Sequence, residues 1–407
     1  MSLVSNAVAD RTDHKDRTPG VKSADPGVQS ACLMSPGDLC ATLEPVTSLD
    51  ELEVLWLNLE RRSDCSFFQS WAWIGCWLRL LPSGLAPLLL RVSAGSQVVG
   101  LGVLVAREET RHGILRVRRL YLNATGDPSI DTLGLEYNGI LADRRVGELV
   151  IGCFCLTWLL QHKELWDELN LGGLDTAATG AWAKAARKAD LGFRIWSKVR
   201  CDYVDLSKVR NSGTGYLDCL SRNSRYQIRR AIRLYETTGP LSLTAAQTPA
   251  EGFAFLEELR DLHQTSWIRR GHPGAFASEY YGRFHHDLVS GWSGSGDIQL
   301  LRVSAGNQVI GYLYNLVKDG VVYAYQSGFN YDSDPRRKPG LVSHAFAIEY
   351  NLKSGARIYD FMAGKAQHKK SLGTDVDEMT WPVVYRKLTK LRIENLLRDL
   401  KSRIRTR

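Results

Sequence analysis

Three basic residues, Arg336, Arg337 and Lys338, stand directly before a Pro-Gly step that opens an apolar segment. Proline suits the first position of a helix, and the free amide groups and positive dipole end of a helix N-terminus attract anions. We therefore expect Gly340 and Leu341 to start a helix and, together with the three cations, to bind a phosphate or diphosphate. An exposed basic loop before an ordinary helix start is the alternative interpretation.

Candidates for proton transfer follow this loop. His344 lies one turn into the predicted helix, and Asp360 ends the next predicted strand, a position that often lines a site in an open sheet. Either group can take the proton that an attacking amine must lose. Tyr325 is a candidate for protonating a leaving group. Each has a structural alternative: a buried histidine, a turn-capping carboxyl and an aromatic residue that packs in the core.

The residues expected to bind substrates come from several segments. Lys369 follows Gly364 in a predicted loop near the basic residues, where it can bind a donor's phosphate. Glu136, Tyr137 and Asn138 are expected to form a wall that the first half contributes. The candidates for acceptor binding are Trp267, Arg270, Tyr323, Gln326 and Tyr137. No cysteine–histidine cluster in the sequence has metal-ligand spacing, so we expect no metal.

An internal repeat indicates the architecture that must position these residues. The segment LRVSAGSQVVG at 90–100 returns as LRVSAGNQVIG at 301–311, with nine of eleven positions identical. Each copy reads as a strand, a tight turn and a second strand, so the sequence predicts a tandem duplication. The predicted divisions are a mobile N-terminal tail (1–37), a non-catalytic N-terminal domain (38–205), a basic linker helix (206–235), a C-terminal catalytic domain (236–385) and a basic C-terminal helix (386–407).

The elements of the second copy are the clearer ones. We predict strands at 241–245, 298–303, 308–317, 321–329, 358–362 and 379–385, and helices at 250–270, 278–289 and 341–352. Three meandering strands followed by one strand–helix–strand crossover indicate an α/β fold of the mixed α+β kind. Each half then contains a mixed, mostly antiparallel sheet flanked by helices.

Composition and charge exclude several classes of protein. The 407 residues are 44% hydrophobic and 24% charged, which is typical of a globular protein. The longest near-apolar run, 149–160, is too short to cross a membrane, and no signal-peptide pattern begins the chain, so we expect a cytoplasmic location. The net charge of +8 is concentrated in two amphipathic stretches, 222–233 and 386–407. Their basic faces are either solvated or docking surfaces for phosphate, nucleic acid, an acidic carrier protein or an anionic membrane.

The order strand, strand, basic loop, helix, strand resembles the core of the GNAT acyltransferases, whose loop and helix N-terminus hold the pyrophosphate of coenzyme A. The second half further resembles the CelD/BcsL acetyltransferase type associated with cellulose biosynthesis, which is related to the Fem-type aminoacyltransferases. The matching pieces are Leu262-His263, Trp267 to Gly271, Tyr325, Gly328-Phe329, Pro339-Gly340, Gly355, Tyr359 to Gly364 and His368-Lys369. That type usually has Tyr where His368 stands, and an acid is common where Lys365 stands.

The resemblance implies tandem GNAT-like domains and an N-acyltransferase that moves an acyl group from a CoA thioester to an amine by direct attack. Acyl-CoA is then a co-substrate, an acyl carrier protein is the alternative donor, and the acceptor is a small-molecule, sugar or peptide amine. Two other functions stay open. One is transfer of an amino acid from charged tRNA, with the nucleic acid bound by residues 222–233. The other is a non-catalytic accessory role in an envelope or polysaccharide pathway, with peripheral membrane contact.

Overall fold

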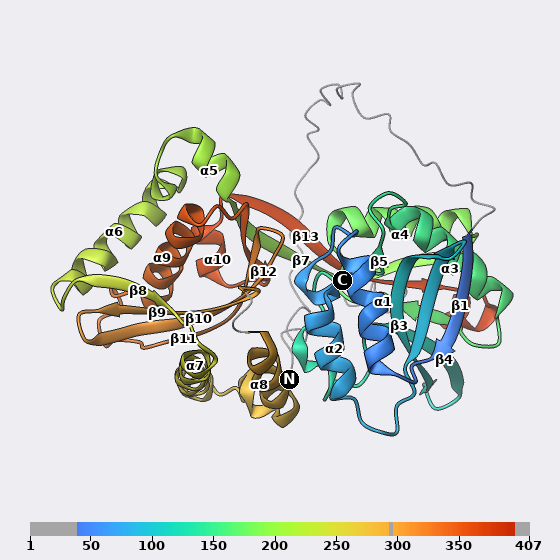
Figure 1. Ribbon diagram of the computed structural model, residues 1–407. Helices are drawn as coiled ribbons and strands as arrows, with labels where there is room; N and C mark the ends of the chain where they lie inside the picture. Colours follow the sequence, from blue (N-terminus) through green and yellow to red (C-terminus); the bar gives the residue numbers. More distant parts are fainter. Residues whose placement is uncertain (1–38, 293–295, 395–407) are drawn as a thin grey trace, which may run out of the picture.

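The computed structural model describes residues 39–292 and 296–394 and shows two lobes that share one sheet (Figure 1). The predicted tail 1–37 and the end of the predicted C-terminal helix, 395–407, lie outside the described residues. The sheet has 13 strands in the order β1-β2-β3-β4-β6-β13-β7-β12-β11-β10-β9-β8, with β5 paired to β3 at the side. Parallel and antiparallel pairs both occur, so the predicted mixed α/β class is confirmed.

The first half forms one side of the sheet. Its strands are β1 (Leu39–Pro45), β2 (Leu88–Ala94), β3 (Gln97–Arg111), β4 (Leu115–Leu122), β5 (Leu141–Ala142) and β6 (Glu168–Asn170). Helices α1 (Leu49–Glu60) and α2 (Trp71–Arg79) pack on one face, and α3 (Glu148–Gln161) and α4 (Thr176–Lys188) pack on the other.

The second half repeats this plan. Its strands are β8 (Leu241–Ala245), β9 (Ile298–Ala305), β10 (Gln308–Lys318), β11 (Val321–Phe329) and β12 (Ile358–Ala363). Helices α7 (Pro249–Arg269) and α8 (Glu279–Trp292) lie on one face, and α5 (Leu206–Ser212), α6 (Arg222–Glu236) and α9 (Pro339–Lys353) lie on the other. The predicted strands 241–245 and 321–329 agree with the structure to the residue. The segment around Lys369 is a short helix, α10 (Gln367–Leu372), where a loop was predicted.

Both copies of the repeat form the predicted hairpins, β2–β3 and β9–β10. The turn glycines Gly95 and Gly306 each have φ of +56°, in the left-handed region that favours glycine. The repeat therefore retains glycine because the turn geometry is the same in both copies.

The last strand of each half crosses to the other lobe. β7 (Gly192–Asp205) ends the first half and pairs with β12 of the second, while β13 (Asp375–Tyr385) ends the second half and pairs with β6 of the first. β7 and β13 also pair with each other along their length and form the long ribbon between the lobes (Figure 1). Each half thus completes the sheet of the other.

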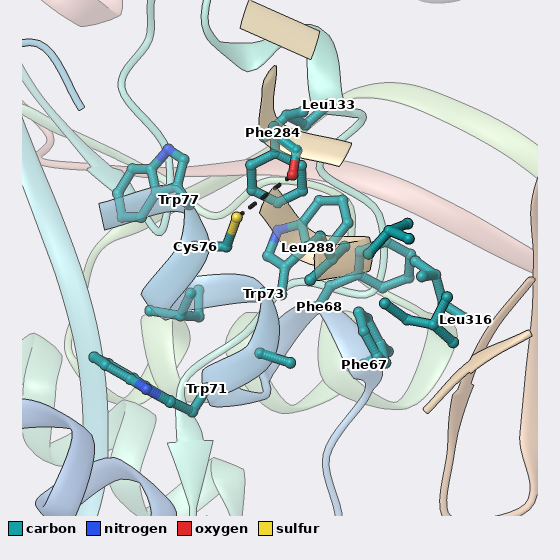
Figure 2. Packing of buried hydrophobic residues seen from close by; sticks show 14 of the residues in the cluster. Phe67, Phe68, Trp71, Trp73, Cys76, Trp77, Leu133, Phe284, Leu288 and Leu316 are labelled. Carbon is teal, nitrogen blue, oxygen red and sulfur yellow. Dashed lines mark hydrogen bonds between the residues drawn. The ribbon is translucent and has the colours of Figure 1, made fainter. Parts of the chain in front are cut away.

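An aromatic core crosses the seam between the halves (Figure 2). Trp73 of α2 lies 4.7 Å from the ring of Phe284 in α8, and the Cys76 thiol donates to the Phe284 carbonyl at 3.5 Å. Phe68 packs against Tyr323 of β11 with ring centroids 5.4 Å apart. Burial of such rings contributes roughly 2–3 kcal/mol each. The core therefore fixes the first half against the strand that carries the candidate site.

The described part of the predicted C-terminal helix folds back on the first half. Lys390 donates to Asp167 at 2.7 Å, and Arg386 lies 3.6 Å from the same buried carboxylate. Lys387 pairs with Asp190 at 2.5 Å. These cations bind carboxylates of the chain itself. Among the described residues, no helix has both the length and the apolar character needed to cross a bilayer.

Candidate active site

The two central strands of the second half diverge at the candidate site. β11 and β12 run parallel for three residue pairs, the last of which is Tyr323 with Asp360, and then separate. β11 continues to Phe329 with β10 on its other side, and a register shift leaves Tyr325 as an extra, bulged residue. At Ser327 the carbonyl turns away from β10 and accepts from His263 Nδ1 at 3.2 Å. Among the described residues, therefore, no strand pairs with this edge of β11 beyond Tyr323, and the edge lies close to the start of α9.

Asp360 lies where the strands part. Its side chain is buried; the Tyr137 hydroxyl donates to Oδ2 at 2.6 Å, and the Met362 amide donates to Oδ1 at 2.6 Å. Burial raises the pKa of Asp360 to about 6, although both hydrogen bonds favour the ionised form. A carboxyl group with a pKa near neutrality is suited to accept a proton from an amine.

The two residues that bind Asp360 both have left-handed backbone conformations. Tyr137 has φ of +51° and Met362 has φ of +60°, which is rare for bulky side chains. The Ser66 hydroxyl donates to the Tyr137 carbonyl at 2.7 Å and helps to hold this conformation. Each such residue costs on the order of 1–3 kcal/mol, and strain of this kind concentrates at functional sites.

A second carboxyl and a lysine complete the arrangement. Glu136 Oε2 accepts from the Ala363 amide at 2.7 Å, and Lys369 Nζ donates to the Ala363 carbonyl at 2.8 Å. Burial raises the pKa of Glu136 to about 7 and lowers the pKa of Lys369. The lysine and each carboxyl group stabilise one another's charged forms, whereas the Asp360 charge raises the pKa of Glu136 further. We call Glu136, Tyr137, Asp360 and Lys369 the seam cluster. Both halves of the chain contribute to it.

The start of α9 presents backbone amide groups at a crowded position. Pro339 is its first residue, and the first helical bond runs from the Val342 amide to the Lys338 carbonyl, so the Gly340 and Leu341 amides precede the bonded turns. A Cβ atom on Gly340 would lie 3.2 Å from the Phe329 ring, which leaves little space for a larger residue.

Two of the three cations before α9 have partners in or next to the loop, so the start of α9 presents fewer free charges than the sequence suggested. Asp334 binds Arg336 through both carboxylate oxygens, with the closest contact at 2.7 Å. Arg337 lies 3.7 Å from Asp332 and donates to the Thr238 hydroxyl at 3.1 Å. In the part of the chain that the structure describes, no carboxylate pairs with Lys338.

His344 and Tyr325 lie in buried environments. His344 Nδ1 is 3.0 Å from the Tyr359 hydroxyl, and burial together with neighbouring His368 lowers its pKa well below the ordinary value. A histidine that resists protonation is a weak base, so the two pKa shifts favour Asp360 over His344 as the proton acceptor. The Tyr325 hydroxyl donates to the Leu133 carbonyl at 2.7 Å, and burial raises its pKa far above the ordinary value.

The predicted acceptor-binding residues lie in three places. Tyr137 and Tyr323 lie together, with ring centroids 5.2 Å apart, beside Asp360. Gln326 donates to the Tyr281 hydroxyl at 3.2 Å. Trp267 and Arg270 lie at the end of α7, where Trp267 packs 5.7 Å from the ring of His263 and Arg270 donates to the Tyr331 hydroxyl at 3.2 Å.

The first half offers an internal comparison. The parallel pairing of β4 with β6 ends at Tyr121 and Asn170, the step that Tyr323 and Asp360 occupy in the second half. An amide that accepts from Arg119 thus replaces the carboxyl. Helix α3 begins with Glu148, whose carboxyl accepts from Trp182 at 2.9 Å and has its pKa raised to about 7 by burial. An acid at a helix N-terminus disfavours binding of a second anion there.

Sequence reasoning missed two features. Glu136 was predicted as a wall and not as a titrating group, because its contact with Ala363 spans 227 residues of chain. The loop acids Asp332 and Asp334 were visible beside the arginines, and a local count of charges would have found them.

Comparisons with known proteins agree with this geometry. Residues 222–370 match the family model described as an acetyltransferase (GNAT) domain. The crystal structure of FemX superposes with a TM-score of 0.55 at 10% identity and covers 86% of this chain and 98% of its own. The C-terminal domain of a putative lysylphosphatidylglycerol synthetase from Agrobacterium fabrum gives 0.49 at 8% identity, covering 86% of this chain and 96% of its own. A tandem GNAT protein from the clavulanic acid pathway gives 0.42 at 13% identity, covering 84% and 98%.

The FemX likeness shows a shared fold and nothing about substrates, because the identity is so low. The other two scores support no argument. No curated protein matches the chain in sequence. The family model covers the diverging strands, the start of α9 and Asp360. Residues 222–370 are therefore an acetyltransferase (GNAT) domain, and the chain is an N-acyltransferase by the class of that domain.

Proposed function

We propose that this chain transfers an acyl group from a thioester donor directly to an amine, with Asp360 as the proton acceptor. The observation that carries the proposal is the Asp360 carboxyl itself. It lies where β11 and β12 part, its pKa is about 6, and two residues with left-handed backbones bind it. Such a group is mostly ionised at neutral pH and still basic enough to take a proton.

The donor in this proposal is a thioester on a pantetheine arm, carried by acyl-CoA as a co-substrate or by an acyl carrier protein. Its thioester arm lies along the uncovered edge of β11, where backbone groups beyond Tyr323 have no partner strand. The Gly340 and Leu341 amides and the Lys338 ammonium group bind phosphate at the start of α9. Arg336 and Arg337 add to this binding when a phosphate displaces Asp334 and Asp332, because exposed ion pairs are weak.

The reaction follows from these positions. Asp360 takes a proton from the acceptor's ammonium group, directly or through water, and the nitrogen lone pair attacks the thioester carbonyl. A backbone amide of β11 stabilises the oxyanion of the tetrahedral intermediate. The attacking nitrogen then loses its second proton to water, the carbon–sulfur bond breaks, and the thiolate takes the proton held by Asp360. A neutral amide, a thiol and an ionised Asp360 remain. Lys369 favours the ionised form of Asp360 between turnovers.

The acceptor binds beside the seam cluster. Glu136 and Asp360 place two carboxyl groups against one lysine, which favours a cationic amine. The rings of Tyr137 and Tyr323 form an aromatic wall beside them. The first half supplies Glu136 and Tyr137 and, with Asn170 and Glu148 at the corresponding positions, is proposed to bind no donor itself.

Three finer statements belong to the same proposal. The matching residues that follow Tyr359 support the CelD/BcsL type, and the sequence divisions at 38–205 and 236–385 are proposed as the two duplicated units. A cytoplasmic location, where acyl-CoA is available, is proposed with them.

Mass spectrometry of N-acylated products tests the function. The purified protein is incubated with acetyl-CoA or longer acyl-CoAs and a panel of amino sugars, amino acids and peptides. We expect an acylated amine from the native chain, at least a hundredfold less from Asp360→Asn, and native amounts from Asn170→Asp, the same position in the first half. Product that disappears after ribonuclease treatment would point to charged tRNA as the donor instead.

A further inference from the structure

A stripe of arginines runs along the exposed side of α6. Arg222, Arg225, Arg229 and Arg233 follow helical spacing and, with Tyr226, Ile232 and Glu236 of the same helix, line a shallow, open surface hollow of about 470 Å³. We call this surface the α6 hollow. A 15-residue helix is about 22 Å long, so the arginines extend over the length of one short helix.

The charges of the α6 hollow are available to a partner. Arg225 and Arg229 both contact Asp218 at 3.0 Å, and exposed pairs of this kind contribute little stability. Among the described residues, no carboxylate pairs with Arg222 or Arg233. An anionic surface can therefore bind here without breaking strong internal contacts.

The α6 hollow adjoins the proposed donor site. Arg337, in the loop before α9, donates to Thr238 directly after α6 and lies 5.2 Å from the ring of Tyr235. That loop carries Asp332 and Asp334 against three cations, so its net charge is only about +1. Coenzyme A carries a diphosphate and a third phosphate. The pantetheine arm of a carrier protein carries a single phosphodiester, which matches the net charge of the loop without displacing Asp332 or Asp334 from the arginines.

We propose that the physiological donor is an acyl carrier protein that docks an acidic helix in the α6 hollow and passes its thioester arm to the site between β11 and β12. The inference rests on the proposed function and names its donor. Charge complementarity over one helix length carries it. A bilayer is the poorer partner, because Ile228 and Ala231 on the apolar side of α6 are buried and cannot insert into it. An RNA strand is the poorer partner because the stripe is only one helix long.

Calorimetry with two probes tests the proposal: a bacterial acyl carrier protein loaded with an octanoyl group, and octanoyl-CoA. The variant is Arg222→Glu with Arg233→Glu, since neither arginine pairs with a carboxylate in the part of the chain that the structure describes. The control is Arg187→Glu with Lys188→Glu, the same charge change at the exposed end of α4. We expect the variant to bind the carrier at least tenfold more weakly and octanoyl-CoA within twofold of the native chain, with both affinities unchanged in the control. Retained octanoyl-CoA binding also shows that the variant is folded.

Three results would overturn the docking proposal. One is equal carrier affinity in the native chain and the variant, and another is a carrier affinity no better than that of octanoyl-CoA. The third is tighter binding of an RNA oligonucleotide or of anionic phosphatidylglycerol vesicles through the same arginines. Failure of the proposed function is separate: the carrier would bind through the α6 hollow, yet no amine would be acylated from either donor.

Discussion

Replacement of Asp360 by Asn separates the stability cost of this carboxyl from its proposed chemistry. Asn has nearly the shape of a protonated carboxyl: its Oδ1 accepts from the Met362 amide and its Nδ2 donates to the Tyr137 hydroxyl, so both contacts remain. Burial raises the pKa of Asp360 from 3.8 to about 6, so the folded chain binds a proton more tightly than the unfolded chain. Ionisation therefore costs folding stability as pH rises.

The size of the effect follows from the two pKa values. At pH 8 the ionised carboxyl lowers the free energy of unfolding by about 3 kcal/mol relative to a neutral group, and at pH 5 by about half of that. Asp360→Asn should therefore stabilise the chain by about 3 kcal/mol at pH 8 and by clearly less at pH 5, while amine acylation falls at least a hundredfold. Urea unfolding followed by tryptophan fluorescence at both pH values measures the first effect, and product formation measures the second.

The reasoning fails if Asp360→Asn is as stable as the native chain, or less stable, at pH 8. It fails equally if the stability difference does not change between pH 5 and pH 8. Either result would mean that the carboxyl is solvated or fully compensated in the folded chain. Asn170→Asp serves as the matched control, because it places a carboxyl at the corresponding step beside Arg119.

Three further variants test the surroundings of this carboxyl. Tyr137→Phe removes a hydrogen bond that favours the ionised form of Asp360, so the acid limb of the pH–rate profile should move to higher pH by roughly one unit; an unmoved limb would exclude Asp360 as the titrating base. Lys369→Met should move the same limb to higher pH, because a cation that favours the ionised form of Asp360 is lost. Lys369→Arg keeps the charge and should leave the limb close to its native position. Equal shifts in both variants would contradict an effect of charge. Gly340→Val should lower the free energy of unfolding by about 1–3 kcal/mol, because the valine side chain meets the Phe329 ring. The same change should weaken acyl-CoA binding in calorimetry, and a native donor affinity would place the phosphate elsewhere.

Local pattern was sufficient to predict most elements of the second half. β11 begins with a run of Val and Tyr residues after a turn, and α9 starts with Pro339, so both were found from the sequence. The helix α10 was missed because its six residues, five of them polar or basic and only Leu372 apolar, are too few to show helical periodicity. The crossing of β7 and β13 between the lobes depends on pairing between distant segments, which no local pattern reveals.

The candidate site was predictable only where its residues act within one element. Asp360 was found because the sequence predicted it at the end of a strand; β12 continues to Ala363, and only its pairing with β11 ends at Asp360. Its partner Tyr137 lies 223 residues away in sequence and joins it through the fold. The arginines before α9 were expected to face a ligand, and the structure pairs them with acids of the same loop. Tyr325 was expected near the thioester, but its hydroxyl donates to the Leu133 carbonyl within the aromatic core between the halves.

Hydrogen–deuterium exchange with acyl-CoA bound tests the central claim most directly, because it reports where the donor lies without knowledge of the acceptor. The account predicts slower exchange in two places: the uncovered edge of β11 over 324–329, and the start of α9 at Gly340 and Leu341. Exchange around Asn170 and Glu148 in the first half should stay unchanged. Protection confined to the first half, or acyl-CoA binding with no change in β11 and α9, would contradict the claim that the thioester lies between the diverging strands.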